Sequence, residues 1–138
     1  MRKMVFLILS SFIFCLSACH HGASLHTVQG EEISLSSLNG KWIVLNYWSS
    51  WSESSKQEIA QLNELSHEFP ANVVFLSHNY LLLPHESLSQ VVSKYHIKLP
   101  VIKESMQQYY PLPKVTRLPV VYIINPEGKL AGVVKGAR

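Results

Sequence analysis

The stretch N-Y-W-S-S-W-S-E-S-S, residues 46–55, places Ser52 and Ser55 three positions apart. A serine hydroxyl becomes a nucleophile only when a general base lies beside it. The chain has no G-x-S-x-G elbow, and the S-x-x-K spacing fails because Glu53 lies three residues before Lys56. We therefore expect Ser52 to cap a helix, its hydroxyl accepting a free N–H of the first turn, which contributes roughly 0.5–2 kcal/mol.

Both cysteines of the chain lie near its N-terminus. Arg2 and Lys3 precede a long apolar run, the pattern of an export signal. The run ends in L-S-A-C, which resembles the bacterial lipobox. This predicts a signal peptide at 1–18, lipid attachment at Cys19 and a tether over 19–25. The alternative is ordinary signal cleavage nearby, with Cys19 as a free thiol.

On the lipobox interpretation the mature chain has no redox thiol. Cys15 leaves with the signal peptide and Cys19 becomes a thioether, so no internal disulfide can form. Stable anchoring by acyl chains then places the protein in the bacterial cell envelope, facing the periplasm or exterior.

Composition excludes several other functions. The chain has 138 residues, 47% hydrophobic and 15% charged, which suits one domain, 26–138. A net charge of +3 with scattered basic residues argues against a nucleic-acid partner. No aspartate is present, and the histidines at 67, 78, 85 and 96 show no H-x-x-x-H pair, so we expect no metal and no cofactor.

Apolar periodicity predicts the elements that position Ser52. T-V-Q-G-E-E-I-S-L indicates two short strands around Gly30, and 41–48 is a nearly continuous apolar strand covered on both faces. A helix is expected from Ser52 to about 68, stopped by Pro70, followed by a strand at V-V-F-L-S. Pro84 to about 96 predicts a second helix, and two strands around the turn N-P-E-G predict a hairpin.

Two motifs carry a family resemblance over about residues 25–136. G-K-W-I-V-L-N-Y-W-S-S-W-S-E-S-S-K-Q-E resembles the G-K-x-x-x-x-N-F-W-A-x-W-C-x-x-C-x-x-E stretch of membrane-anchored TlpA/ResA-type thiol:disulfide oxidoreductases. R-L-P-V-V-Y-I-I-N-P-E-G-K is similar to their G-x-P-T-x-F-x-I-D-x-x-G-x motif. The resemblance implies an α/β thioredoxin-like fold, with a central mixed sheet flanked by helices.

The same resemblance assigns roles to single residues. Ser52 and Ser55 occupy the two cysteine positions, and Pro119 corresponds to the family's cis-proline facing them. A thiolate is the attacking species in disulfide exchange, and an alcohol stays protonated at physiological pH. The C-x-x-C motif is thus replaced by S-x-x-S, and the resemblance implies the fold without the redox chemistry.

Two classes of function follow. The first is a binding module, in which Leu118 and Pro119 with Trp51 hold an extended peptide or protein client by strand addition. The second is an enzyme: an oxidoreductase-family member, or a thiol-binding transferase in which Ser52 stabilises a bound thiolate. Trp51 precedes the helix and is either a contact residue or part of the core.

The chain ends at G-V-V-K-G-A-R, where the resembling proteins continue into a final helix. Val121 and Ile123 face one side of their strand, and Val120, Tyr122 and Ile124 the other. We therefore expect the fold to lack the C-terminal helix and to leave an apolar patch, which a partner or a homodimer would cover.

Overall fold

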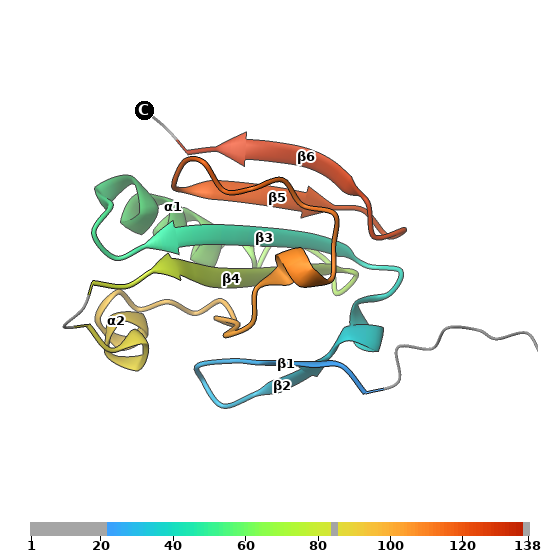
Figure 1. Ribbon diagram of the computed structural model, residues 1–138, viewed down its shortest axis with the longest axis horizontal. Coiled ribbons are helices and arrows are strands. Elements are labelled where there is room, and N and C mark those ends of the chain that lie inside the picture. Colours follow the sequence, from blue (N-terminus) through green and yellow to red (C-terminus); the bar gives the residue numbers. More distant parts are fainter. Residues whose placement is uncertain (1–21, 84–85, 137–138) are drawn as a thin grey trace, which may run out of the picture.

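Four strands form one mixed sheet in the order β4-β3-β5-β6. β3 (Trp42–Ser49) runs parallel to β4 (Val73–Leu81) and antiparallel to β5 (Val120–Ile124). β6 (Leu130–Lys135) pairs antiparallel with β5. Figure 1 shows the sheet with β3 and β5 at its centre, so the predicted central mixed sheet is confirmed.

The computed structural model describes residues 22–83 and 86–136. The predicted signal peptide, 1–18, and the lipid-attachment residue Cys19 lie outside the described residues. Within the described residues, no helix is both long and apolar enough to span a bilayer.

Both crossover helices follow a strand of the sheet. α1 (Glu53–Leu65) comes after β3, and α2 (Leu88–Lys94) comes after β4. The predicted cap of α1 is confirmed, because Ser52 Oγ accepts the backbone N–H of Ser55 at 3.2 Å. The helix ends at Leu65, earlier than the end expected near residue 68, and Ser66 is its C-cap.

The second helix is shorter than its apolar spacing predicted. The prediction began at Pro84 and ended near His96, whereas α2 spans Leu88–Lys94. Ser87 precedes α2 with an extended backbone (ψ 131°), and His96 follows it with a positive φ of 51°. A left-handed residue just after the last turn ends an α-helix, which explains the C-terminal limit. Residues 84–85 lie outside the described part of the chain.

A small hairpin precedes the sheet, as predicted around Gly30. β1 (Ser24–His26) pairs antiparallel with β2 (Glu32–Ser34), and Gly30 in the connection has a φ of +93° that glycine adopts readily. Two short 3-10 helices, η1 (Leu35–Leu38) and η2 (Met106–Gln108), complete the described elements.

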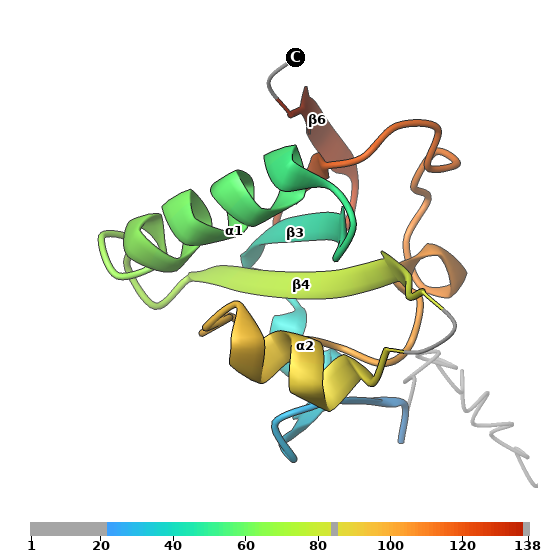
Figure 2. The ribbon, with the colours of Figure 1, turned by 90° about the vertical axis from the view of Figure 1, so that its left-hand side faces the viewer.

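The two faces of the sheet carry separate hydrophobic clusters. Val120, Tyr122 and Ile124 of β5 belong to one cluster and Val121 to the other, which confirms the predicted alternation. Figures 1 and 2 show α1 on one side of β3 and the segment containing η2 on the opposite side. Buried side chains of α1 and α2 pack in the same cluster as Val121.

β6 is an edge strand with exposed apolar side chains. Val133 is 42% and Val134 50% exposed. Val134 lies opposite Val121, on the α1 side of the sheet, and Val133 lies opposite Tyr122, on the other side. No helix follows β6 within residues 22–83 and 86–136. The expectation of an exposed face on β5 is wrong, because Val120, Val121, Tyr122 and Ile124 are all buried. The exposed valines lie on the edge strand β6, one on each face of the sheet.

The side chain of Asn63 ties α1 to the chain that follows α2. Asn63 is 7% exposed, and its Nδ2 donates to the carbonyl of His96 at 2.9 Å. Its Oδ1 accepts the backbone N–H of Lys98 at 3.0 Å. One amide thus satisfies two backbone groups in a segment that has no regular partner strand, and it fixes the position of α1.

We expect Asn63→Ala to lower the free energy of unfolding by about 2–4 kcal/mol, because two hydrogen bonds are lost and two backbone groups remain poorly satisfied. Urea unfolding of the purified chain measures this change. Gln61→Ala, at an exposed position of the same helix, is the control and should stay within about 0.5 kcal/mol of the parent. Equal effects of the two substitutions would contradict the assigned role of Asn63.

Candidate functional site

The candidate site lies where β3 ends and α1 begins. The register between β3 and β5 pairs Tyr47 with Val120, so Pro119 lies beside the end of β3. The Leu118–Pro119 peptide bond is cis, as the resemblance implied. The pairing of β3 with β5 therefore brings the cis-proline to the end of the sheet where Ser52 starts its helix.

Both serines of the S-x-x-S motif use their hydroxyls inside the chain. Ser55 is fully buried, and its Oγ accepts the backbone N–H of Ser49 at 3.3 Å. Ser52 is partly buried and accepts the N–H of Ser55. Among the residues that the structure describes, no imidazole, amine or carboxylate is hydrogen-bonded to either hydroxyl. The arrangement is that of a helix start and contains no general base.

The predicted contact residues differ in their exposure. Trp51 is 53% exposed, so of its two predicted uses the structure favours surface contact over the core, while Trp48 is fully buried. Pro119 is buried, and its carbonyl accepts the N–H of Gly136 at 2.9 Å. Leu118 is partly buried, and neither its N–H nor its C=O is hydrogen-bonded to any described residue.

Sequence reasoning missed Glu58, which lies one helical turn beyond Ser55. Asn46 of β3 donates from Nδ2 to Glu58 Oε1 at 2.7 Å. A Cβ added to Gly136 would lie 3.2 Å from Glu58 Oε2 and 2.3 Å from Pro119 Cγ, so the carboxyl lies close to the cis-proline. The glutamate that ends the matched family stretch was the available signal.

Burial raises the pKa of Glu58 from the ordinary 4.5 to about 7, although the hydrogen bond from Asn46 opposes the shift. The carboxyl group is thus close to half protonated at neutral pH. The neutral amide of Asn46 can donate to the ionised carboxylate, but it brings no compensating positive charge.

A second side-chain contact involves Ser50, in the loop between β3 and α1. Ser50 is 3% exposed and donates from Oγ to Glu86 Oε2, which also accepts the N–H of Leu83 at 3.1 Å. The chain that follows β4 is thereby attached to the loop between β3 and α1. The sequence held no signal for this pair, because 36 residues separate them.

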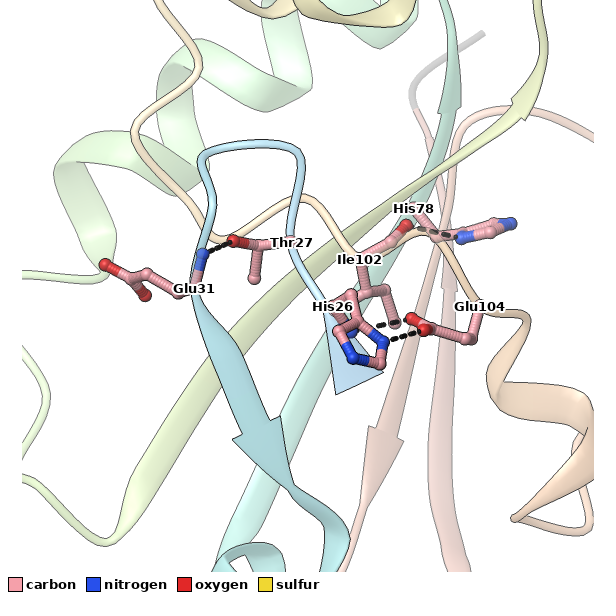
Figure 3. A network of polar contacts seen from close by, with 6 residues as sticks. All are labelled: His26, Thr27, Glu31, His78, Ile102 and Glu104. Atoms are coloured by element: carbon pink, nitrogen blue, oxygen red, sulfur yellow. Dashed lines mark hydrogen bonds and ion pairs between the residues drawn. The ribbon is translucent and has the colours of Figure 1, made fainter. Parts of the chain in front are cut away.

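The described histidines do not form a metal site. Figure 3 shows His26 contacting Glu104 through both its backbone N–H, at 2.8 Å, and its Nδ1, at 2.5 Å. Burial lowers the pKa of His78, and its Nδ1 donates to the carbonyl of Ile102 at 2.9 Å. No three histidine, cysteine or acidic side chains of the described residues come together as metal ligands. His85 lies outside the described residues.

Comparison with known proteins identifies the lineage. A family model described as the AhpC/TSA family matches residues 19–133. The chain belongs to the AhpC/TSA family. Over 113 residues it is 31% identical to the thiol-disulfide oxidoreductase ResA of Bacillus subtilis. This match covers 81% of this chain and 63% of that protein. ResA of Oceanobacillus iheyensis is 27% identical over 80% of this chain and 57% of its own length.

The chain spans about three-fifths of the length of these curated relatives. A thioredoxin-family thiol:disulfide interchange protein from Chlorobium tepidum superimposes with a TM-score of 0.67 at 22% identity, covering 84% of this chain and 83% of that chain. The exposed lipoprotein thioredoxin of Streptococcus pneumoniae superimposes with a TM-score of 0.63 at 25% identity, covering 84% of this chain and 90% of that chain. The thioredoxin-like fold is confirmed, and ResA-type oxidoreductases are homologues of this AhpC/TSA family member.

The raised pKa of Glu58 makes stability depend on pH. The folded protein keeps a proton on Glu58 that the unfolded chain releases near pH 4.5. Glu58 therefore costs no stability below pH 4.5, and its cost grows as pH rises toward about 7, where it levels off. Glu58→Gln removes this titration and keeps an amide oxygen for Asn46, so we expect it to raise the free energy of unfolding by about 2–3 kcal/mol at pH 8.

Urea unfolding at pH 4 and pH 8 measures the difference between Glu58→Gln and the parent chain. At pH 4 we expect the two to be nearly equal. Glu64→Gln, at an exposed position of α1, is the matched control and should show no gain that depends on pH. A gain for Glu58→Gln that is the same at both pH values would show that folding does not shift the pKa of this carboxyl.

Proposed function

We propose that this AhpC/TSA family member is a lipid-anchored protein of the bacterial cell envelope that binds extended peptide segments and does not exchange disulfides. The observation that carries the proposal is the cis Leu118–Pro119 segment, whose Leu118 backbone N–H and C=O have no partner among the described residues. Unpaired backbone groups beside a sheet can bind an added strand.

The surroundings of Leu118 support this use. A peptide that pairs with Leu118 would form two backbone hydrogen bonds, each contributing roughly 0.5–1.5 kcal/mol. The half-exposed indole of Trp51 supplies apolar contact area on the adjoining loop. Burying such aromatic side chains is a common source of affinity in protein interfaces.

The hydroxyls of the S-x-x-S motif support loss of the redox reaction. In disulfide exchange a thiolate attacks one sulfur of the client's disulfide; a mixed disulfide forms as the client's S–S bond breaks, and its other sulfur leaves as a thiolate. Ser52 instead accepts the N–H of Ser55 in the first turn of α1, and Ser55 accepts the N–H of Ser49 at the end of β3. The positive end of the helix, which would stabilise a thiolate at this position, has no thiol to ionise.

Anchoring at Cys19 is the remaining element of the proposal. The L-S-A-C sequence supports it, as does the likeness to the exposed lipoprotein thioredoxin of Streptococcus pneumoniae. An anchor would hold the domain at a membrane surface, where an extracytoplasmic peptide client would be encountered. A homodimer through the apolar edge of β6 is compatible with this placement.

Insulin reduction in the presence of dithiothreitol tests the loss of redox activity. In a background with Cys15 and Cys19 replaced by serine, we expect no catalysis from the parent chain. Ser52→Cys with Ser55→Cys restores a dithiol at the start of α1 and beside the cis-proline, so we expect it to give turnover above the dithiothreitol rate.

The matched control places the same spacing elsewhere. Ser87→Cys with Gln90→Cys puts two thiols at the start of α2, where Ser87 is the N-cap, and we expect it to be inactive. Turnover by the parent chain would refute the proposed loss of disulfide exchange. Equal activity of the two dithiol variants would show that the cis-proline neighbourhood contributes nothing.

Metabolic labelling with an alkyne analogue of palmitate tests the anchor. We expect the parent chain to be labelled and recovered with membranes, since acyl chains bury about 0.8 kcal/mol per CH₂ in the bilayer. Cys19→Ala should remove the label and the membrane association, while Cys15→Ala should retain both. Label that persists in Cys19→Ala would exclude lipid attachment at this cysteine.

A further inference from the structure

A cavity of about 260 Å³ lies between the loop before β5 and the face of β5 and β6. Val120 and Tyr122 of β5 and Val133 of β6 form an apolar floor. The register places Tyr122 opposite Val133, so their side chains share this face. The hydroxyl of Tyr122 donates to the carbonyl of Pro113 at 3.2 Å, which holds the loop over the floor.

The rim of this cavity is positively charged. Lys114 and Arg117 reach it from the loop and Lys135 from β6, where Lys135 lies opposite Val120 on the same face. No acidic side chain lines the cavity. Within residues 22–83 and 86–136, none of the three forms an ion pair. Three unpaired cations around an apolar floor favour an anionic occupant, whose charge would also reduce their mutual repulsion.

The size of the cavity limits that occupant. About 260 Å³ is below the roughly 300–1,000 Å³ of sites for drug-sized ligands, and it suits one side chain. A carboxylate on a short hydrocarbon stem would place its charge at the rim and its methylene groups on the floor. Arg117 can bind such a carboxylate through two N–H groups at once.

The position of the cavity indicates what carries the carboxylate. Arg117 directly precedes the cis Leu118–Pro119 segment. Figure 1 shows the segment before β5 running across the front of the sheet before it turns into the strand. A peptide paired with the Leu118 backbone would therefore pass the rim. The cations surround a cavity and do not form a flat face, which favours one inserted side chain over a membrane surface.

We propose that this pocket receives an acidic side chain of an extended peptide bound at Leu118, so that the protein selects acidic clients. The inference rests on the proposed function, because the backbone of the peptide must first pair at Leu118. The carboxylate recognition itself rests on Lys114, Arg117 and Lys135.

Isothermal titration calorimetry of the full-length chain in neutral detergent tests the selectivity. The probe is acetyl-Thr-Val-Thr-Glu-Thr-Val-Thr-amide, and its matched partner has Gln in place of Glu. Three exposed cations, each contributing modestly to an ion pair, predict a preference on the order of tenfold for the Glu peptide. Raising the salt concentration should reduce this preference, because exposed charges are screened.

The triple variant Lys114→Gln, Arg117→Gln, Lys135→Gln should bring the two affinities together by weakening binding of the Glu peptide about tenfold relative to the Gln peptide. Lys98→Gln, Lys103→Gln, Lys129→Gln removes the same charge from exposed positions outside the pocket and should keep the preference. A preference that survives the pocket variant, or disappears in the control, would overturn the assignment.

The remaining outcomes separate the two proposals. If both peptides bind with equal affinity, the acidic pocket is refuted and peptide binding stands. If neither peptide binds, the proposed function and this inference are both refuted. Binding of acetyl-glutamate methylamide without either peptide would make the ligand a free carboxylate. Binding of phosphatidylglycerol vesicles that the pocket variant alone abolishes would assign the charge to a lipid surface, and either result overturns the inference.

Discussion

The antiparallel pairing of β3 with β5 is the constraint on which the candidate site depends. It pairs Tyr47 with Val120 and thereby places Pro119 beside the end of β3. The hydrogen bond from Gly136 to the Pro119 carbonyl then fixes the end of β6 against the same segment. Neither the start of α1 nor the cis-proline could form a site alone, and the register of one strand pair brings them together.

The two serine hydroxyls at the start of α1 fit into this framework through hydrogen bonds to the backbone. Ser52 retains the helix cap and Ser55 retains a bond to the backbone of Ser49. Glu58 is different, because its partly buried carboxyl has an unfavourable ionisation at neutral pH. A destabilising carboxyl that lies near the cis-proline is therefore not explained by packing alone.

The sequence predicted those elements in which apolar periodicity or local chemistry decides the structure. The strand of 41–48, the cap at Ser52 and the alternation along β5 followed from such patterns, and the cis bond at Pro119 followed from the resemblance. The limits of α2 could not be read from the sequence, because the conformation of Ser87 and the left-handed His96 set them.

The cationic pocket was hidden because its residues are distant in sequence and join only through tertiary structure. Lys114 and Arg117 meet Lys135 because β6 folds back beside β5 and the loop crosses the same face. Sequence inspection described these residues only as scattered charges. The hydrogen bond between Asn46 and Glu58 likewise joins β3 to α1. It becomes apparent only when the strand and the helix are packed together.

The two faces of the sheet at the end of β6 carry different charged groups, with cations on one face and Glu58 on the other. Lys135 lies on the face of the cationic pocket, whereas Gly136 approaches Glu58 and Pro119. Successive side chains of an extended peptide point to opposite faces, with a period of two. A client paired at Leu118 would thus present one residue to the cations and the next toward Glu58, which at neutral pH is partly uncharged. An acidic residue flanked by neutral ones satisfies both faces, because adjacent acidic residues would bring one carboxylate against Glu58.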